Sequence, residues 1–171
     1  MIKDIVELIK SILIAIIAAV LIITFVFETV SVDGQSMFPT LNHKDRLIVE
    51  KVSYYFREPK AGDVVVFKYP ADTREKFIKR VVAVAGDKVK IENNRLYVNG
   101  KEIDEPYINE KIINGFYSEA VVPENTIFVL GDNRNYSKDS RFPDVGFVSL
   151  KLVVGRAALR IYPFNKAGRI G

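Results

Sequence analysis

The 171-residue chain contains no cysteine, and His43 is its only histidine. Without cysteine it can form no disulfide bridge, no thiolate zinc site and no cysteine nucleophile. It also lacks runs of lysine and arginine and any interleaving of aromatic and basic residues, so we do not expect a nucleic-acid partner. Beyond residue 28, no segment has a sustained 3.6-residue periodicity, which argues against a helical domain.

Hydrophobic residues make up 49% of the chain and charged residues 27%, which is typical of a folded protein rather than a disordered one. Charged residues are missing from the seventeen positions between Lys10 and Glu28. Together with the apolar residues before Lys10, this run can span about 30 Å of hydrocarbon as a helix. We expect residues 1–28 to form a membrane anchor and residues 29–171 to form one domain.

A cleaved signal peptide is the alternative interpretation of the N-terminal segment. Its apolar region would be about 7–15 residues long and would end at a cleavage site with small residues. The run here is longer, and residues 25–29 offer no such site, so we expect the anchor to remain uncleaved. Lys3 and Lys10 favour a cytoplasmic N-terminus, which would put the domain on the outer face of the cell membrane. Charges in the first 27 residues cancel, so the net charge of +4 lies in the domain and favours contact with anionic membrane lipids.

Short strand patterns separated by turn residues follow the anchor. Asn93-Asn94 and Asn99-Gly100 are typical of tight hairpins, whereas residues 104–125 look like an irregular loop. The pattern predicts an all-β domain of antiparallel sheets, folded over into a barrel-like shape, after one N-terminal transmembrane helix. The strands are expected at residues 47–49, 64–67, 77–85, 88–91, 95–98, 101–103, 126–130 and 153–162.

Ser36 opens the segment Ser-Met-Phe-Pro-Thr-Leu, eight residues beyond Glu28. Eight extended residues reach roughly 27 Å, so Ser36 would lie near the membrane surface. A serine hydroxyl becomes a good nucleophile only when a base takes its proton. His43 could be that base within a Ser-His-Asp triad, although it also fits an ordinary charged turn.

Lys79 is the other candidate base, provided that it can be neutral. On a strand it would share one face with Phe77, Val81 and Ala83, while Arg80 would point the opposite way. Burial among such apolar groups lowers a lysine pKa from its usual value of about 10.4. A lysine at a sheet edge, with its head in water, would fit the same pattern.

Residues 131–141 form a polar stretch directly after a predicted strand. Such a loop could orient a lysine and supply a carboxylate for Arg80, or it could be an ordinary polar turn. Asp132 and Arg134 break the alternating ligand pattern of a calcium-binding loop. We therefore expect neither a metal site nor a cofactor.

Four stretches, taken together and in order, resemble type I signal peptidases, the bacterial membrane-bound Ser-Lys proteases that remove signal peptides from secreted proteins. The resemblance implies that Ser36 is the nucleophile and Lys79 its general base, with the Ser36 backbone N–H donating to the oxyanion. Some members carry a serine as a second oxyanion donor where this chain has Gly34. The matching stretches are residues 36–41, 57–67, 79–87 and 131–141.

The same resemblance assigns supporting roles and a substrate path. Ser137 would orient Lys79, Asp132 would pair with Arg80, and Asp139 would pair with Arg141. The precursor would bind as an added strand, with small residues just before the scissile bond. Expected walls of its site are Val32, Asp33, Met37 and Leu41 on one side and Phe77 and Ile78 on the other.

Two other functions remain open at this point. A membrane-tethered β-domain could bind a partner without catalysis, with Ser36 and Lys79 serving only the fold. A Ser-Lys self-cleaving regulator would have a similar fold, but the apolar anchor and the lack of a DNA-binding helix pair argue against it.

Overall fold

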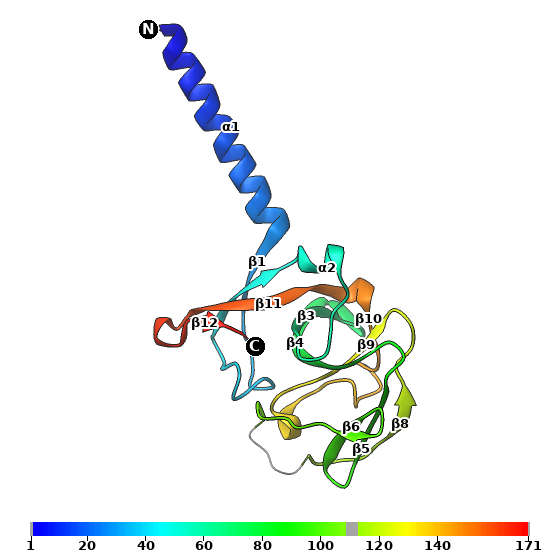
Figure 1. The fold of residues 1–171 in the computed structure, drawn as a ribbon. Coiled ribbons are helices and arrows are strands. Elements are labelled where there is room, and N and C mark those ends of the chain that lie inside the picture. The colour runs from blue at the N-terminus through cyan, green and yellow to red at the C-terminus, as the bar shows by residue number, and fades with distance from the viewer. Residues whose placement is uncertain (1, 109–112, 171) are drawn as a thin grey trace.

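The computed structural model describes residues 2–108 and 113–170. Helix α1 (Ile2–Val26) projects away from a β domain, as Figure 1 shows. By length and composition α1 could cross a membrane, and its most apolar stretch is not buried against the rest of the protein. The predicted N-terminal helix is therefore present, and the first strand begins at Phe27, one residue after the helix ends.

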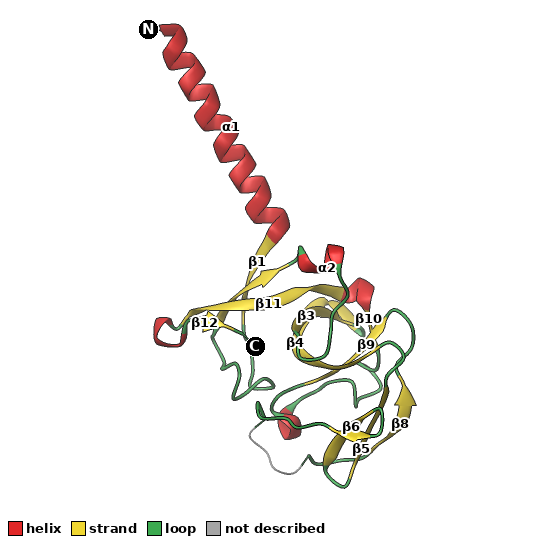
Figure 2. Ribbon diagram, in the orientation of Figure 1, coloured by secondary structure: helices red, strands yellow, loops and turns green. Residues whose placement is uncertain are grey.

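Two antiparallel sheets form the domain, which confirms the predicted fold class (Figure 2). In the larger sheet the strand order is β1-β2-β11-β3-β4-β9-β10, with β12 beside β11. Its strands are β1 (Phe27–Ser31), β2 (Arg46–Glu50), β3 (Val64–Tyr69), β4 (Asp72–Val84), β9 (Thr126–Leu130), β10 (Val148–Ser149), β11 (Val153–Tyr162) and β12 (Gly168–Arg169).

The smaller sheet has the order β7-β6-β5-β8 and lies at the end of the domain remote from α1 (Figure 1). It is built from β5 (Lys88–Glu92), β6 (Arg95–Val98), β7 (Lys101–Glu102) and β8 (Tyr117–Val121). The expectation of an irregular loop over residues 104–125 is wrong where strand β8 forms. Its sequence, Tyr-Ser-Glu-Ala-Val, has little strand pattern of its own, and its order comes from pairing with β5.

Four short helical elements complete the described chain. These are α2 (Ser53–Phe56), η1 (Arg134–Tyr136), η2 (Leu150–Leu152) and η3 (Phe164–Lys166).

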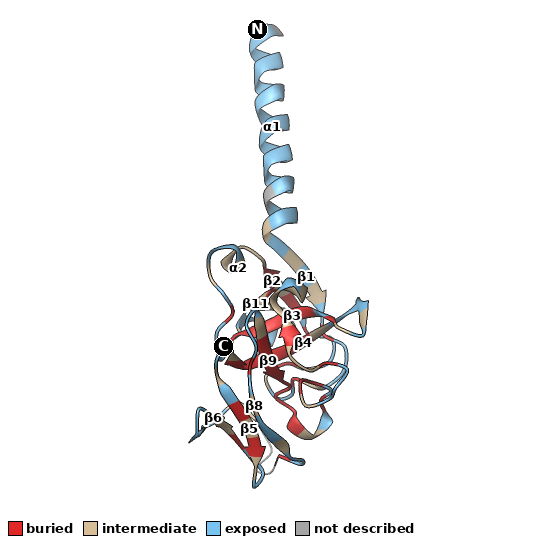
Figure 3. Cartoon of the chain, turned by 90° about the vertical axis from the view of Figure 1, so that its right-hand side faces the viewer, coloured by how far each residue is buried: buried red, intermediate tan, exposed pale blue. Residues whose placement is uncertain are grey.

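Strand β4 connects the three hydrophobic clusters of the domain. Ile78 belongs to one cluster and Val81 to a second, whereas Val82 and Ala83 both belong to a third. The expected alternation of Val81 and Ala83 on one face is therefore wrong, because the pairing with β9 shifts register between them. Figure 3 shows the buried residues concentrated in β3, β4 and β9, around the strand that carries Lys79.

Gly155 marks a close approach of β11 to β2. A Cβ atom at this position would lie 2.4 Å from the Glu50 carbonyl oxygen and 2.9 Å from Val49 Cγ1. Backbone cannot yield as a flexible side chain can, so any larger residue here forces the two strands apart.

We expect Gly155→Ala to destabilise the domain by about 1–3 kcal/mol, the usual range for overpacking. For a chain of this length the midpoint of thermal unfolding would fall by about 2–12 °C. Circular dichroism of the full chain in detergent micelles measures this. Gly168→Ala is the matched control, because a Cβ at Gly168 meets nothing within 4 Å. Equal melting of the two variants would contradict the close approach.

Candidate active site

Ser36 and Lys79 meet in space although 43 positions separate them in the sequence. Ser36 lies in the turn between β1 and β2, and Lys79 lies on β4. Lys79 Nζ is 2.8 Å from Ser36 Oγ, within hydrogen-bonding distance, and it also donates to the Ile78 carbonyl oxygen at 3.0 Å. The pair has the geometry that a nucleophile and its base require.

Lys79 is only 4% exposed, so its ammonium form would be held out of water. This burial lowers the lysine pKa from 10.5 to about 8, although the charges of Asp139 and Asp132 oppose the shift. The ring of Phe77 lies 5.1 Å from Nζ and stacks on Tyr69, which adds to the apolar surroundings. Desolvation therefore brings the pKa of the amine to about one unit above neutral pH, so that a fraction of the lysine is neutral there.

The loop after β9 holds the Ser36 turn in place. Asn133 donates from its backbone N–H to the Ser36 carbonyl oxygen and from Nδ2 to the Gln35 carbonyl oxygen, both at 3.0 Å. Gly131 permits this approach, because a Cβ there would lie 2.1 Å from Ser137 Oγ and 2.4 Å from the Ser36 carbonyl oxygen. The fourth sequence stretch thus packs directly on the first.

Arg80 points away from Lys79 and forms a two-point ion pair with Asp132. Arg80 Nε donates to Asp132 Oδ1 at 2.9 Å, and Nη2 donates to Oδ2 at 2.8 Å. Both side chains are buried, and Arg80 Nη1 also donates to the Gly62 carbonyl oxygen at 3.0 Å. This pair joins β4 to the loop that carries Asn133.

Asp139 and Arg141 form a second two-point pair, with distances of 2.8 and 2.9 Å. Asp139 also accepts a hydrogen bond from the Gly131 backbone N–H at 3.0 Å. The far end of the loop is thereby tied to its first residue. Both pairings have the partners that the family resemblance implied.

A third buried ion pair, unlike the first two, was not expected from the sequence. Arg134 is buried and pairs with Glu105, with Nη2 2.6 Å from Oε1, and its Nε donates to the Gly131 carbonyl oxygen at 3.0 Å. Tyr107, two residues after Glu105, lies over the guanidinium of Arg80 at 4.0 Å. Part of the predicted loop thus covers the buried ion pairs, and no local pattern in the sequence signals contacts over this separation.

Ser137 requires a correction. The resemblance implied a hydrogen bond from Ser137 to Lys79, but within the described residues the buried Ser137 Oγ has no hydrogen-bond partner. Lys79 instead directs Nζ to Ser36 and to the Ile78 carbonyl oxygen. Ser137 lines a different hollow, which it shares with Arg134 and Arg141.

A groove of about 500 Å³ leads to Ser36 and Lys79 between β1 and β4. Of the expected walls, Leu41 is wrong: it is fully buried in a hydrophobic cluster and contributes nothing to the groove. The other five expected residues, Val32, Asp33, Met37, Phe77 and Ile78, do line it. Five residues that the sequence did not indicate also line it: Val30, Ser31, Glu75, Lys76 and Lys138.

His43 does not stand in the position of a base for Ser36. Its Nδ1 accepts a hydrogen bond from the Gly34 backbone N–H at 3.2 Å and lies 3.4 Å from Asp33 Oδ1. In the described part of the chain, the side chain that hydrogen-bonds Ser36 Oγ is Lys79. The geometry therefore matches a Ser-Lys pair rather than a Ser-His-Asp triad.

Comparisons with known proteins show the family of the chain. The family model "Signal peptidase, peptidase S26" matches residues 5–162. Signal peptidase I of Leptolyngbya laminosa is 40% identical over 96% of this chain and 83% of its own length. Signal peptidase I S of Bacillus subtilis is 38% identical over 96% and 92%. A crystal structure of a signal peptidase I from Enterococcus faecalis aligns with a TM-score of 0.51 and 28% identity, over 58% of this chain and 97% of that one. The chain therefore belongs to the signal peptidase family, peptidase S26.

Proposed function

We propose that this chain is a membrane-anchored serine endopeptidase that removes N-terminal signal peptides from secreted precursor proteins. Ser36 is the nucleophile and Lys79 is the general base. The observation that carries the proposal is the 2.8 Å contact between Lys79 Nζ and Ser36 Oγ at a buried lysine. A domain that only bound a partner would have no need of a desolvated lysine beside a serine.

In the proposed mechanism, the neutral amine of Lys79 accepts the hydroxyl proton of Ser36 as Oγ attacks the scissile carbonyl carbon. The backbone N–H of Ser36 donates to the developing oxyanion. Lys79 then returns the proton to the leaving amine, and the C–N bond breaks to give an acyl-enzyme. A water molecule, deprotonated by Lys79, releases the signal peptide and restores the Ser36 hydroxyl.

Gly34 does not supply a second hydrogen-bond donor to the oxyanion. Glycine has no hydroxyl, and the Gly34 backbone N–H already donates to His43 Nδ1. His43 thus holds the turn that precedes the nucleophile, a positional role rather than a chemical one.

The precursor binds as an extended strand in the groove between β1 and β4. Support comes from the pairing pattern: β1 is the edge of the large sheet, and the pairing of β4 with β9 begins at Arg80. The free edges can therefore accept main-chain hydrogen bonds from a substrate strand. Val32, Asp33, Met37, Phe77 and Ile78 contact the residues before the scissile bond.

Residues 1–28 anchor the protein in the cell membrane as a single span, and residues 29–171 act on its outer face. Lys3 and Lys10 support this orientation by the positive-inside rule. Signal peptides are themselves inserted in the membrane, so confining both reactants to one surface raises their effective concentration. The basic domain also contacts anionic lipids.

Substitution at the pair tests the assignment. Ser36→Ala abolishes cleavage, and Lys79→Ala lowers kcat/KM by about 10²–10⁴-fold, the usual contribution of a general base. Lys79→Arg does not rescue it, because a guanidinium stays protonated. Cleavage of a secretory precursor in detergent micelles measures these effects. His43→Ala is the control and retains most activity; its inactivation would reassign the base.

The pH dependence of cleavage follows from the lowered pKa of Lys79, about 8. Only about a tenth of the amine is neutral at pH 7, so kcat/KM rises about tenfold as the pH increases to a plateau above the pKa. A rate limb near pH 10.5 would mean that Lys79 is not desolvated. A limb near pH 6.5 that disappears in His43→Ala would point to the histidine.

The lowered pKa of Lys79 also makes the stability of the folded domain depend on pH. The folded pKa lies below the unfolded value, so Lys79 destabilises the domain most at pH values below about 8. This destabilisation fades as the pH rises toward 10.5, because the unfolded chain then binds more protons than the folded one. Lys79→Met should therefore raise the melting temperature at pH 7 and raise it less at pH 10. An equal difference at both pH values would contradict the lowered pKa.

Gly131→Ala tests whether the loop after β9 positions the nucleophile. The added methyl would overlap Ser137 and the Ser36 carbonyl oxygen, so the turn must shift. A displacement of about 1 Å can cost about 10²-fold in rate, and we expect a kcat loss of that order. Gly168→Ala, which adds a methyl in open space, is the control. Full activity of Gly131→Ala would show that Ser36 is positioned by other contacts.

A further inference from the structure

The end of α1 is joined to β2 and the segment after it. Lys51 donates its backbone N–H to the carbonyl oxygen of Val26, the last residue of α1, at 2.9 Å. Phe27 is the register partner of Glu50. Glu28 also pairs with Lys51 at 3.2 Å and with Lys76 on β4. Residues 50 and 51 therefore lie at the level where the helix meets the domain.

The single turn of α2 follows two residues later and presents two aromatic side chains to solvent. Tyr55 is 74% exposed and Phe56 86% exposed. The turn itself is held firmly: Ser53 donates its backbone N–H to Glu50 Oε2 at 3.0 Å, and the Tyr54 hydroxyl donates to Asp63 Oδ2 at 3.2 Å. Tyr54 thus fixes the turn while its two neighbours project outward.

Both views of the whole chain place α2 at the end of the domain from which α1 leaves (Figures 1 and 3). Tyr55 follows Lys51 by four positions, which limits the distance between their Cα atoms to roughly 14 Å. Phe25, near the end of α1, and Phe27, the first residue of β1, are also exposed. Aromatic side chains therefore gather where the anchor meets the domain.

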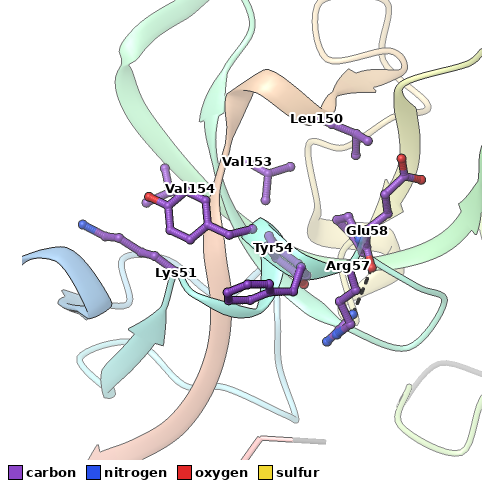
Figure 4. Close-up of a pocket in the computed structure, with 10 residues that line it drawn as sticks. Lys51, Tyr54, Arg57, Glu58, Leu150, Val153 and Val154 are labelled. Carbon is purple, nitrogen blue, oxygen red and sulfur yellow. Dashed lines mark hydrogen bonds between the residues drawn. The ribbon is translucent and has the colours of Figure 1, made fainter. Parts of the chain in front are cut away.

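A hollow of about 360 Å³ lies beside the turn (Figure 4). Leu150, Val153 and Val154 contribute apolar surface to it, and Tyr55 and Phe56 belong to the same lining. Exposed aromatic groups beside apolar surface are costly in water and mark a contact site.

We propose that the Tyr55–Phe56 turn is a second membrane contact, which inserts into the interfacial region of the lipid bilayer beside α1. This inference rests on the proposed anchoring of α1 in the membrane. A lipid surface is the occupant that the position indicates, because the turn is continuous with the end of the apolar helix. Aromatic residues are also the side chains that bilayer interfaces favour.

The charge of the segment agrees with a lipid partner. Residues 51–60 contain Lys51, Arg57 and Lys60 against a single acidic residue, Glu58, so they carry a net charge of +2. Lys51 and Arg57 are paired with Glu28 and with Asp63 at 2.8 Å, which weakens their pull on anionic headgroups. Aromatic insertion therefore supplies the larger part of the attraction.

A second contact would restrict how the domain turns on its anchor. With α1 alone, the domain could rotate about the junction at Phe27. With the α2 turn also inserted, the groove that begins at Val30 and Ser31 keeps one orientation and one height above the bilayer. The substrate strand, which leaves the same bilayer, would then meet the groove in a constant alignment.

The chain has no tryptophan, so a single substitution creates a unique fluorescent probe. We would place Phe56→Trp, in the full chain, in vesicles of phosphatidylcholine and phosphatidylglycerol whose acyl chains carry bromine near the headgroup or near the tail. The matched control is Phe116→Trp, because Phe116 is 71% exposed and directly precedes β8 in the sheet remote from α1.

We expect the tryptophan of Phe56→Trp to emit at shorter wavelength than that of Phe116→Trp. It should lose most of its emission to bromine near the headgroup, while the control loses little. Equal and weak quenching of the two probes would overturn the proposal. So would a blue shift of Phe56→Trp without bromine quenching, because the turn would then be covered by a second copy or another protein.

The outcome is independent of catalysis. Phe56→Trp combined with Ser36→Ala should be quenched as strongly as Phe56→Trp alone, because the contact involves no reacting group. Failure of the membrane contact and failure of the proposed peptidase activity are therefore separately visible.

Discussion

The site depends on one constraint: the amine of Lys79 must stay out of water while it touches Ser36 Oγ. Lowering a lysine pKa from 10.5 to about 8 reflects a penalty on the charged form on the order of 3 kcal/mol. That is a large part of the 5–15 kcal/mol by which domains are typically stable, so the surrounding fold must hold the lysine firmly. It does so by placing Lys79 on β4, which pairs with β3 on one side and, from Arg80 onward, with β9 on the other, and which contributes to all three hydrophobic clusters.

The buried ion pairs help to keep the pKa of Lys79 low. A carboxylate near the amine stabilises its charged form, and both Asp132 and Asp139 act on Lys79 in this sense. Each of these carboxylates is engaged at two points by an arginine, Arg80 in one case and Arg141 in the other. The guanidinium groups carry the opposite charge and counteract the carboxylates at the amine. Desolvation is the largest effect on the lysine pKa. Removing either arginine would thus disturb the pKa of Lys79 as well as the fold.

Local sequence patterns predicted much of the secondary structure. They failed where a segment is ordered by contacts with residues that are distant in the sequence. The edges of β6, β9 and β11 could be read from the sequence, since each has a strong alternating or apolar pattern between turn residues. Strand β8 could not, because its order comes from pairing with β5. A motif gives the spacing of residues but not their burial, so the expectation that Leu41 lines the groove is wrong. A family resemblance gives bonding partners but not side-chain positions, so the expected hydrogen bond from Ser137 to Lys79 is also wrong. The pair of Arg134 and Glu105 joins two irregular segments, and neither has a pattern that predicts the other.

On the proposed function, strand β1 links the catalytic pair to the membrane. It is the connection from α1, an edge of the large sheet and part of the groove wall, since Val30 and Ser31 line the groove. Its five residues span roughly 17 Å and Ser36 follows five residues later, so with α1 in the bilayer Ser36 would lie near the membrane surface. On the proposed function, a precursor held in the same bilayer must present its scissile bond at that height. The length of β1 then helps to determine which bond of the substrate reaches the nucleophile.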